Sequence, residues 1–244
     1  MKKIVIIGAG SWGTALGLVL ASKDYDVTLW EHNKERAEEV QNSRENKRYL
    51  PGIKLPDNMH ITSESEDLLN GVKYVIFSVP SQSLREVISR FSPQITEDMI
   101  LVNTAKGIEV STGMTLSEVM KDEIKGKYHK NIVVLCGPTH AEEVSIGLPT
   151  TIVAAGLKEK AMEIQELFNS KNFRVYMNED IIGVEIGAAV KNCLAIGAGI
   201  ADGMGYGDNT KAALITRGIA EMTRFGKALG ADERTFSGLT GIGD

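Results

Sequence analysis

The chain has 244 residues, of which 43% are hydrophobic and 24% are charged, and its formal net charge is −5. These values are typical of a soluble globular enzyme with one large domain or two modest ones, and the absence of a basic run argues against nucleic-acid binding. Cys136 and Cys193 match no metal-ligand spacing. We therefore expect no metal site and a reduced, cytoplasmic setting.

Two apolar segments bear on whether the chain has a leader or a membrane-spanning sequence. Lys2 and Lys3 precede an apolar run, but this run ends at Gly8 and has the pattern of a first strand rather than of a secretory signal. Residues 186–201 form the least polar long segment. Since this segment contains Lys191 and is too short to span a bilayer, the sequence predicts no association with a membrane.

A glycine motif near the start organises the first part of the chain. Residues 4–7 are typical of a strand buried on both faces, and residues 8–13, GAGSWG, fit G-x-G-x-x-G and lead into a helix. In such a motif Gly8 permits a tight turn, Gly10 lets a pyrophosphate approach the backbone, and Gly13 lets helix and strand pack closely. A second strand ends before Glu31. This βαβ context favours a dinucleotide site over a chance glycine turn.

Strand and helix patterns then alternate up to about residue 178. Strands are expected at 4–7, 27–30, around 61, 74–77, 100–102, 132–135, 150–154 and 173–176. Helices are expected at 14–21, 34–44, 64–69, 83–91, 116–124, 140–146 and 158–168. This alternation predicts an α/β fold with a doubly wound, mostly parallel Rossmann-type sheet.

The pattern changes near residue 180, where the strands stop. Residues 182–201 and 210–229 predict two long helices joined by a glycine-rich loop. We therefore expect a dinucleotide-binding domain over 1–180 and the start of a helical substrate domain over 181–244.

Three loops follow strands at the edge where ligands bind to open α/β sheets: residues 78–80, 104–107 and 137–139. Lys106 suits a phosphate or a polarised carbonyl, although a solvated loop lysine has the same pattern. Thr139 suits the cap of a helix beginning at His140, with Glu142 completing a capping box. His140 itself has no neighbour in sequence that would make it a catalytic base.

Lys191 is the most informative single residue of the second part. It is the only charged residue between 186 and 201. A lysine cation is costly to bury in such a helix, because burial disfavours the charged form. A lysine that gives up its proton more readily suits proton transfer near neutral pH. A side chain that reaches the surface, or a structural salt bridge, would give the same pattern. Asp244 could orient Lys191.

Five segments carry a family resemblance: GAGSWGTALG, SVPS, NTAKGIE, CGPTHAEEV and the long GAAVKNCLAIGAGIADGMGYGDNTKAALITRG. Together they make the chain similar to the bacterial type of NAD(P)-dependent glycerol-3-phosphate dehydrogenase over its whole length. The resemblance implies reversible reduction of dihydroxyacetone phosphate to sn-glycerol 3-phosphate with NAD or NADP, a cytoplasmic reaction that feeds phospholipid synthesis.

The same resemblance implies a role for individual residues. Lys191 would be the proton donor and acceptor. Substrate would be bound by Lys106, Gly137, Thr139, Lys191 and Asp244. The cofactor would be bound by Gly8, Gly10, Ser11, Trp12, Gly13, His32, Tyr49, Lys106 and Ala141. Glu31 favours NAD by position, whereas the family, with His32 adjacent, also takes NADP.

Members of the family continue past the residue that corresponds to Asp244, into helices with a substrate-binding Ser-Arg-Asn segment. The resemblance therefore implies a truncated helical domain, with an apolar surface that a second copy would cover in a homodimer. Two other functions fit the residues: a dehydrogenase of the β-hydroxy acid or 6-phosphogluconate type, and a dinucleotide-binding module without turnover.

Overall fold

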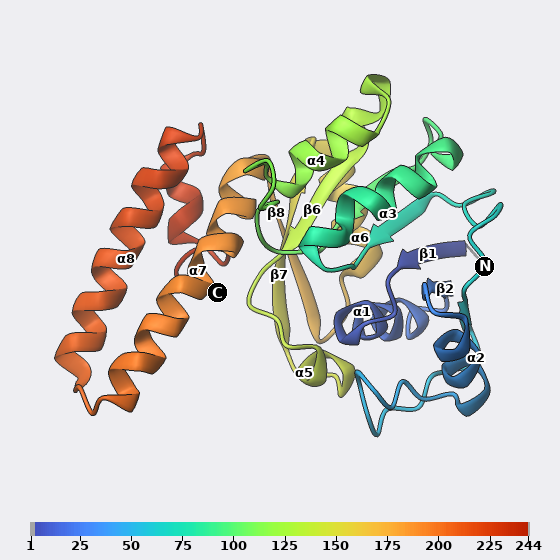
Figure 1. Ribbon diagram of the computed structural model, residues 1–244, viewed down its shortest axis with the longest axis horizontal. Coiled ribbons are helices and arrows are strands. Elements are labelled where there is room, and N and C mark those ends of the chain that lie inside the picture. Colours follow the sequence, from blue (N-terminus) through green and yellow to red (C-terminus); the bar gives the residue numbers. More distant parts are fainter. Residues whose placement is uncertain (1–2, 244) are drawn as a thin grey trace.

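The computed structural model describes residues 3–243, and its centre is an eight-stranded sheet (Figure 1). The strands are β1 (Lys3–Ile7), β2 (Asp26–Trp30), β3 (Met59–Thr62), β4 (Tyr74–Phe77), β5 (Ile100–Asn103), β6 (Ile132–Cys136), β7 (Thr150–Gly156) and β8 (Phe173–Asn178). Their order is β3-β2-β1-β4-β5-β6-β7-β8, and every neighbouring pair is parallel except β6 and β7. The predicted strands and the mostly parallel sheet are confirmed.

Helices cover both faces of this sheet, and two long helices follow its last strand (Figure 1). The helices are α1 (Ser11–Ala21), α2 (Lys34–Ser43), α3 (Leu84–Phe91), α4 (Leu116–Glu123), α5 (Ala141–Ser145), α6 (Lys158–Phe168), α7 (Ile181–Gly203) and α8 (Asp208–Ala228). Alternate residues of β1 divide the core: Ile4 and Ile6 pack in the cluster that contains α1 and α6, whereas Val5 and Ile7 pack with α3 and α4. This two-residue period is what a strand buried on both faces requires, and the predicted doubly wound arrangement is confirmed.

One predicted helix is wrong. Residues 64–69 contain no helix: turns run from residue 66 onward, and Asp67 has a φ of 54°. A non-glycine residue in this left-handed region interrupts a right-handed helix, so the segment cannot complete a helical turn.

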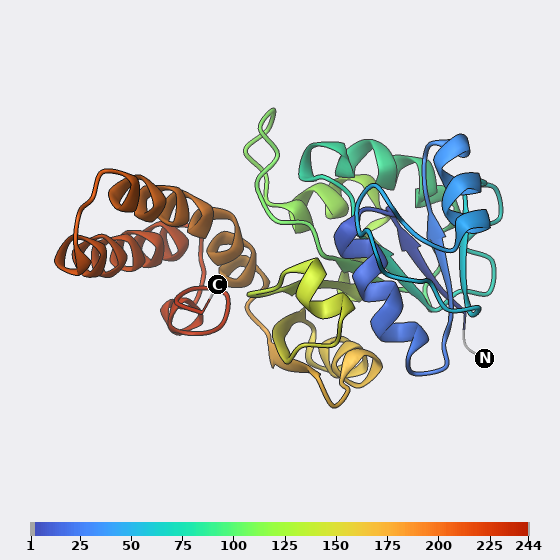
Figure 2. The same ribbon diagram turned by 90° about the horizontal axis from the view of Figure 1, so that it is seen from below.

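The first turns of α7 fasten the two long helices to the sheet. Val184 and Ala188, one turn apart, pack in a buried cluster with Val134 and Cys136 of β6. On another side, Ile186 packs with Met222 of α8 and with Phe236, which lies in the chain that returns after α8. Figures 1 and 2 show α7 and α8 side by side, projecting away from the sheet.

A buried carboxylate joins α7 to α4. Glu185 is 5% exposed, and it accepts hydrogen bonds from the Ser117 backbone N–H at 2.8 Å and from the Ser117 hydroxyl at 2.6 Å. Ser117 lies in the first turn of α4, where free N–H groups favour an anion. Burial nevertheless raises the pKa of the Glu185 carboxyl, while the Ser117 hydrogen bonds oppose that rise.

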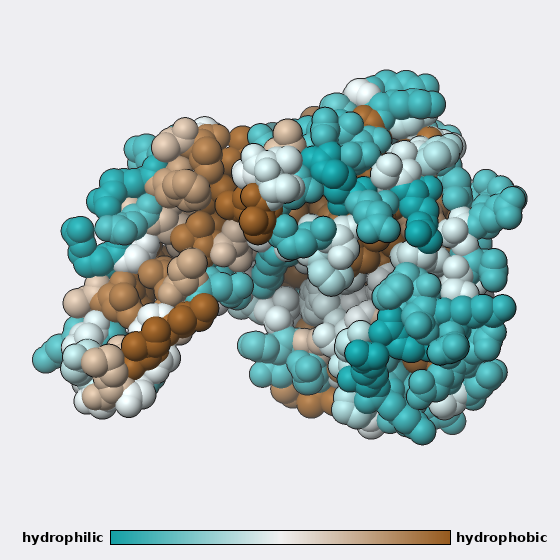
Figure 3. All heavy atoms as spheres, in the orientation of Figure 1, coloured by the Kyte–Doolittle hydropathy of each residue, from teal (hydrophilic) through white to brown (hydrophobic). Residues whose placement is uncertain are grey.

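The outer half of the helical pair carries an apolar surface, as predicted. Ile196 and Ile200 of α7 are 65% and 58% exposed, Met204 immediately after α7 is 61% exposed, and Ile215 of α8 is also exposed. Figure 3 shows hydrophobic side chains over this part of the molecule. The helix containing residues 186–201 has 23 residues and is long and apolar enough to cross a membrane, so the expectation that it is too short is wrong.

The Glu185 contact predicts a pH dependence of stability. Because the folded-state pKa is raised, the folded protein holds a proton that the unfolded chain releases, and the stability contributed by this proton is lost as pH rises through the folded-state pKa. The free energy of unfolding of the native protein, minus that of Glu185→Gln, should therefore fall as the pH rises above 4.5, the ordinary pKa of a glutamate. Urea unfolding of both proteins measures this difference. A difference that rises with pH would show that the Ser117 donors outweigh burial.

Candidate functional site

The glycine loop brings the end of β1 and the start of α1 into close contact. Gly8 has a φ of +114°, and a Cβ there would lie 2.3 Å from the carbonyl oxygen of Ser78. A Cβ at Gly13 would lie 2.0 Å from the carbonyl oxygen of Gly8. Gly10, by contrast, has no heavy atom within 4 Å of its Cβ position. The predicted turn and packing roles of Gly8 and Gly13 are therefore confirmed, and the loop is open at Gly10, where a ligand would approach.

A cavity of about 480 Å³ lies on one side of this loop. It reaches from Gly8 and Gly10 along the ends of β2 and β4 to His32 and Tyr49, and Glu31 and Arg36 also line it. This is the edge of the sheet where the strand order reverses, between β1 and β4. Open α/β sheets bind their ligands at such a switch point.

A second cavity, of about 340 Å³, lies on the other side of the loop. Its lining includes Ser11, Trp12, Lys106, Thr139 and Ala141. The Lys106 ammonium donates a hydrogen bond of 2.8 Å to the carbonyl oxygen of Gly137, so the loops that follow β5 and β6 meet here. The structure thus brings together the predicted residues of three separate segments.

The Lys106 loop is held by side chains that sequence reasoning missed. Gln82 donates to the carbonyl oxygen of Ile108 and accepts from the N–H of Val110, at 2.9 and 3.0 Å. Arg85 of α3 donates to both carboxylate oxygens of Glu109 at 3.0 Å, and this holds the pKa of the Glu109 carboxyl below its usual range. These partners lie more than 20 residues apart, and no local pattern in the sequence signals such contacts.

Thr139 does not cap α5, so this prediction is wrong. His140 has extended backbone and is the residue before the helix, which begins at Ala141. The Thr139 hydroxyl instead donates to the carbonyl oxygen of Gly137 at 3.3 Å. Because the helix starts one residue later than expected, Thr139 lies in the loop and faces the second cavity.

Lys191 lies on α7. It lies three residues after Ala188, which packs in the cluster of Cys136, the residue before Gly137. Lys191 is half-buried rather than buried, and it lies outside the lining of the second cavity. Gly187, one turn before it, packs against the main chain of Thr240, because a Cβ there would lie 2.2 Å from the Thr240 carbonyl oxygen. Asp244, the predicted partner of Lys191, lies outside the described residues.

This fold, with its glycine loop between two cavities at the switch point, defines a Rossmann-type oxidoreductase that uses a dinucleotide. The sequence model of the NAD-dependent glycerol-3-phosphate dehydrogenase N-terminus matches residues 3–162, and that of the C-terminus of the same enzyme matches residues 180–244. The chain therefore belongs to the NAD-dependent glycerol-3-phosphate dehydrogenase family. It interconverts dihydroxyacetone phosphate and glycerol 3-phosphate with NAD(P), and this confirms the reaction that the family resemblance implied.

Individual relatives agree with this assignment. The chain is 51% identical to glycerol-3-phosphate dehydrogenase [NAD(P)+] of Bacillus licheniformis and 50% identical to that of Syntrophomonas wolfei, covering 100% of this chain and 71% of each relative. The crystal structure of glycerol-3-phosphate dehydrogenase from Coxiella burnetii superposes with a TM-score of 0.92 at 39% identity, covering 100% of this chain and 74% of that one. The first turns of α7, from Gly183 to Ala188, are buried within the fold, as in a helix that packs on a domain core.

The glycine loop predicts that two alanine substitutions affect different properties, one the stability of the fold and the other the affinity for NADH. Gly13→Ala should destabilise the fold by about 3 kcal/mol, because its methyl group collides with the Gly8 carbonyl oxygen. Gly10→Ala should change the free energy of unfolding by less than about 1 kcal/mol, because Gly10 has a φ of −71° and open space around it. Gly10→Ala should instead weaken NADH binding at least about tenfold, because the methyl group occupies the approach to the backbone.

Urea unfolding and NADH fluorescence titration of both variants measure these effects. If Gly10→Ala binds NADH with native affinity, the pyrophosphate does not bind at this loop. A fully stable Gly13→Ala protein would contradict the packing described here.

Proposed function

We propose that Lys191 is the acid–base residue of the reaction. Bound NAD(P)H supplies a hydride to the carbonyl carbon of dihydroxyacetone phosphate, and the carbonyl oxygen must gain a proton for glycerol 3-phosphate to form. The Lys191 ammonium donates this proton to the oxygen and takes it back in the reverse direction. The observation that supports this role is the packing of Val184 and Ala188 on β6, which fastens the helix of Lys191 next to the Gly137 loop.

We propose that the two loops after β5 and β6 hold the substrate. Lys106 presents a cation beside Gly137 and Thr139, and it suits the phosphate or the carbonyl oxygen of the substrate. In the same proposal Asp244 orients Lys191. Lys106 also borders the cavity of Ser11 and Trp12, so it would contact both the substrate and the cofactor.

In this proposal the dinucleotide lies along the two cavities. The first, with Gly8, Gly10, His32 and Tyr49, suits the adenosine and the pyrophosphate. The second suits the nicotinamide end, and its lining includes Ser11, Trp12, Lys106 and Ala141. Gly13 contributes through its contact with Gly8, which places the N–H groups at the start of α1 toward the phosphates.

We further propose the wider setting of this reaction. Residues 1–180 bind the dinucleotide and residues 181–244 begin the substrate domain. The product supplies phospholipid synthesis in the cytoplasm. Two copies pair as a homodimer, which would cover exposed apolar side chains of α7 and α8 such as Ile196 and Ile215.

Replacement of Lys191 tests the central role. Lys191→Ala should lower kcat by about 100-fold or more, the scale of general acid–base catalysis, while the dissociation constant for NADH changes little. The decrease in NADH absorbance with dihydroxyacetone phosphate gives kcat, and fluorescence titration gives the affinity for NADH.

Lys211→Ala is the matched control. Lys211 lies on α8 and pairs with Asp202 at 3.0 Å, so its loss removes a lysine from the same helical unit away from β6. Its kcat should stay near the native value. A Lys191→Ala enzyme with near-native kcat would exclude Lys191 as the acid–base residue.

A further inference from the structure

The residue after β2 is an acid, and its negative charge conflicts with binding of the 2′-phosphate of NADP. Glu31 immediately follows Trp30, and its carboxylate side chain is only 7% exposed. In a Rossmann-type site, an acidic residue here accepts a hydrogen bond from the 2′-hydroxyl of the adenosine ribose. An uncompensated carboxylate would repel the 2′-phosphate of NADP. Glu31 alone would therefore restrict the protein to NAD.

Glu31 is, however, already paired. Arg36 Nη2 donates to Glu31 Oε1 at 2.7 Å, the Asn33 N–H donates to the same oxygen at 3.0 Å, and His32 Nδ1 lies 2.9 Å from it. These three contacts converge on Oε1, so Oε2 takes part in none of them. The second carboxylate oxygen can then accept from a ribose hydroxyl while Arg36 balances the charge.

The Arg36 backbone is held in place, but the side chain does not use all its hydrogen-bond donors. The Asn33 side chain accepts from the Arg36 N–H at 2.9 Å, which caps α2 and fixes Arg36 in the first turn. The Arg36 side chain is 21% exposed and borders the larger cavity, and its Nη1 lies 3.4 Å from the Tyr49 hydroxyl, a long contact. Arg36 Nε is buried and has no hydrogen-bond partner among the described residues. The unpartnered Nε and the long Tyr49 contact show that Arg36 has donor capacity beyond its hydrogen bond to Glu31.

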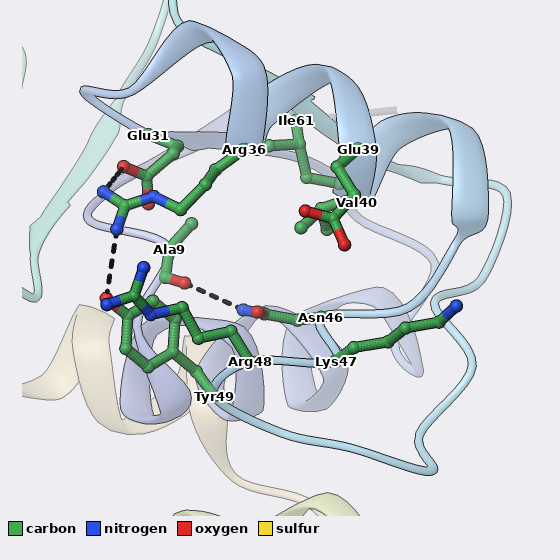
Figure 4. Close-up of a pocket in the computed structure, with 10 residues that line it drawn as sticks. All are labelled: Ala9, Glu31, Arg36, Glu39, Val40, Asn46, Lys47, Arg48, Tyr49 and Ile61. Atoms are coloured by element: carbon green, nitrogen blue, oxygen red, sulfur yellow. Dashed lines mark hydrogen bonds and ion pairs between the residues drawn. The ribbon is translucent and has the colours of Figure 1, made fainter.

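Further cations lie around the same point. A cavity of about 90 Å³ adjoins the first one, and it is lined by three basic residues, Arg36, Lys47 and Arg48, against two acidic ones, Glu31 and Glu39. Figure 4 shows Arg36 between Glu31 and Tyr49, with Arg48 beside the Tyr49 ring. The Arg48 guanidinium carbon lies 5.3 Å from the centre of that ring. A phosphate monoester carries a charge of about −1.5 to −2 at neutral pH, and this surplus of cations suits it.

We propose that Arg36 determines how the site accepts the two cofactors, by moving between Glu31 and the 2′-phosphate. With NAD, Arg36 stays on Glu31 and the carboxylate binds the ribose hydroxyl. With NADP, the guanidinium turns its paired N–H groups to the 2′-phosphate, and Glu31 keeps the Asn33 N–H and His32. The inference rests on the cofactor site proposed above, and it adds the specificity-determining residue.

Two adenosine fragments test this without turnover. Adenosine 2′,5′-bisphosphate carries the adenosine end of NADP, and 5′-AMP carries that of NAD. Isothermal titration calorimetry of the native protein and of Arg36→Ala gives a dissociation constant for each. Arg36→Ala should bind the bisphosphate at least about tenfold more weakly, since it loses a charge-assisted contact and leaves Glu31 unbalanced, while affinity for 5′-AMP changes less than about threefold.

Glu31→Gln is an independent arm of the experiment, because it removes the competing charge and leaves Arg36 intact. It should bind the bisphosphate more tightly than the native protein and 5′-AMP no more tightly. Arg90→Ala is the matched control: Arg90 borders the same large cavity but stacks on Trp30, with 5.5 Å between its guanidinium carbon and the ring centre. This control should leave the ratio of the two affinities unchanged.

Equal effects of Arg36→Ala on both fragments, or a Glu31→Gln protein with unchanged affinity for the bisphosphate, would overturn the proposal. Because these titrations involve no reduction of dihydroxyacetone phosphate, the two proposals can fail separately. A selective Arg36 effect together with native activity of Lys191→Ala would reject only the catalytic role.

Discussion

The close approach of α1 to the end of β1 is the contact on which the rest of the site depends. Only a glycine at position 13 allows it, because any Cβ would collide with the Gly8 carbonyl oxygen. The contact directs the start of α1, with its free N–H groups, to the edge of the sheet at β1 and β4, where the strand order reverses. Both cavities open from this point, one toward β2 and one toward the loops after β5 and β6.

A second constraint brings the helical unit to this edge. α7 is fixed by apolar packing on β6 through Val184 and Ala188, and by the buried carboxylate of Glu185 at the start of α4. A buried acid with a raised pKa is a costly way to join two helices, but its geometry is specific. This combination sets the rotation of α7 about its axis, and with it the direction in which Lys191 leaves the helix.

Much of this arrangement was predictable from local patterns. The β-branched runs, the glycine motif and the change of pattern near residue 180 gave all eight strands and both long helices. The turn at 64–69 and the start of α5 were missed, because Asp67 and His140 adopt backbone conformations that residue type alone does not determine. Contacts between distant segments, such as Arg85 with Glu109, depend on tertiary packing and leave no signal in a single sequence.

The claim that Lys106 and Lys191 act on one substrate from two separately anchored elements can be tested directly with a double-mutant cycle. kcat/KM for dihydroxyacetone phosphate would be measured for the native enzyme, Lys106→Ala, Lys191→Ala and the double variant. Residues that stabilise the same transition state are strongly non-additive, so the double variant should lose at least about tenfold less than the product of the two single losses. Strictly multiplicative losses would show that the two lysines act independently and would contradict a shared site.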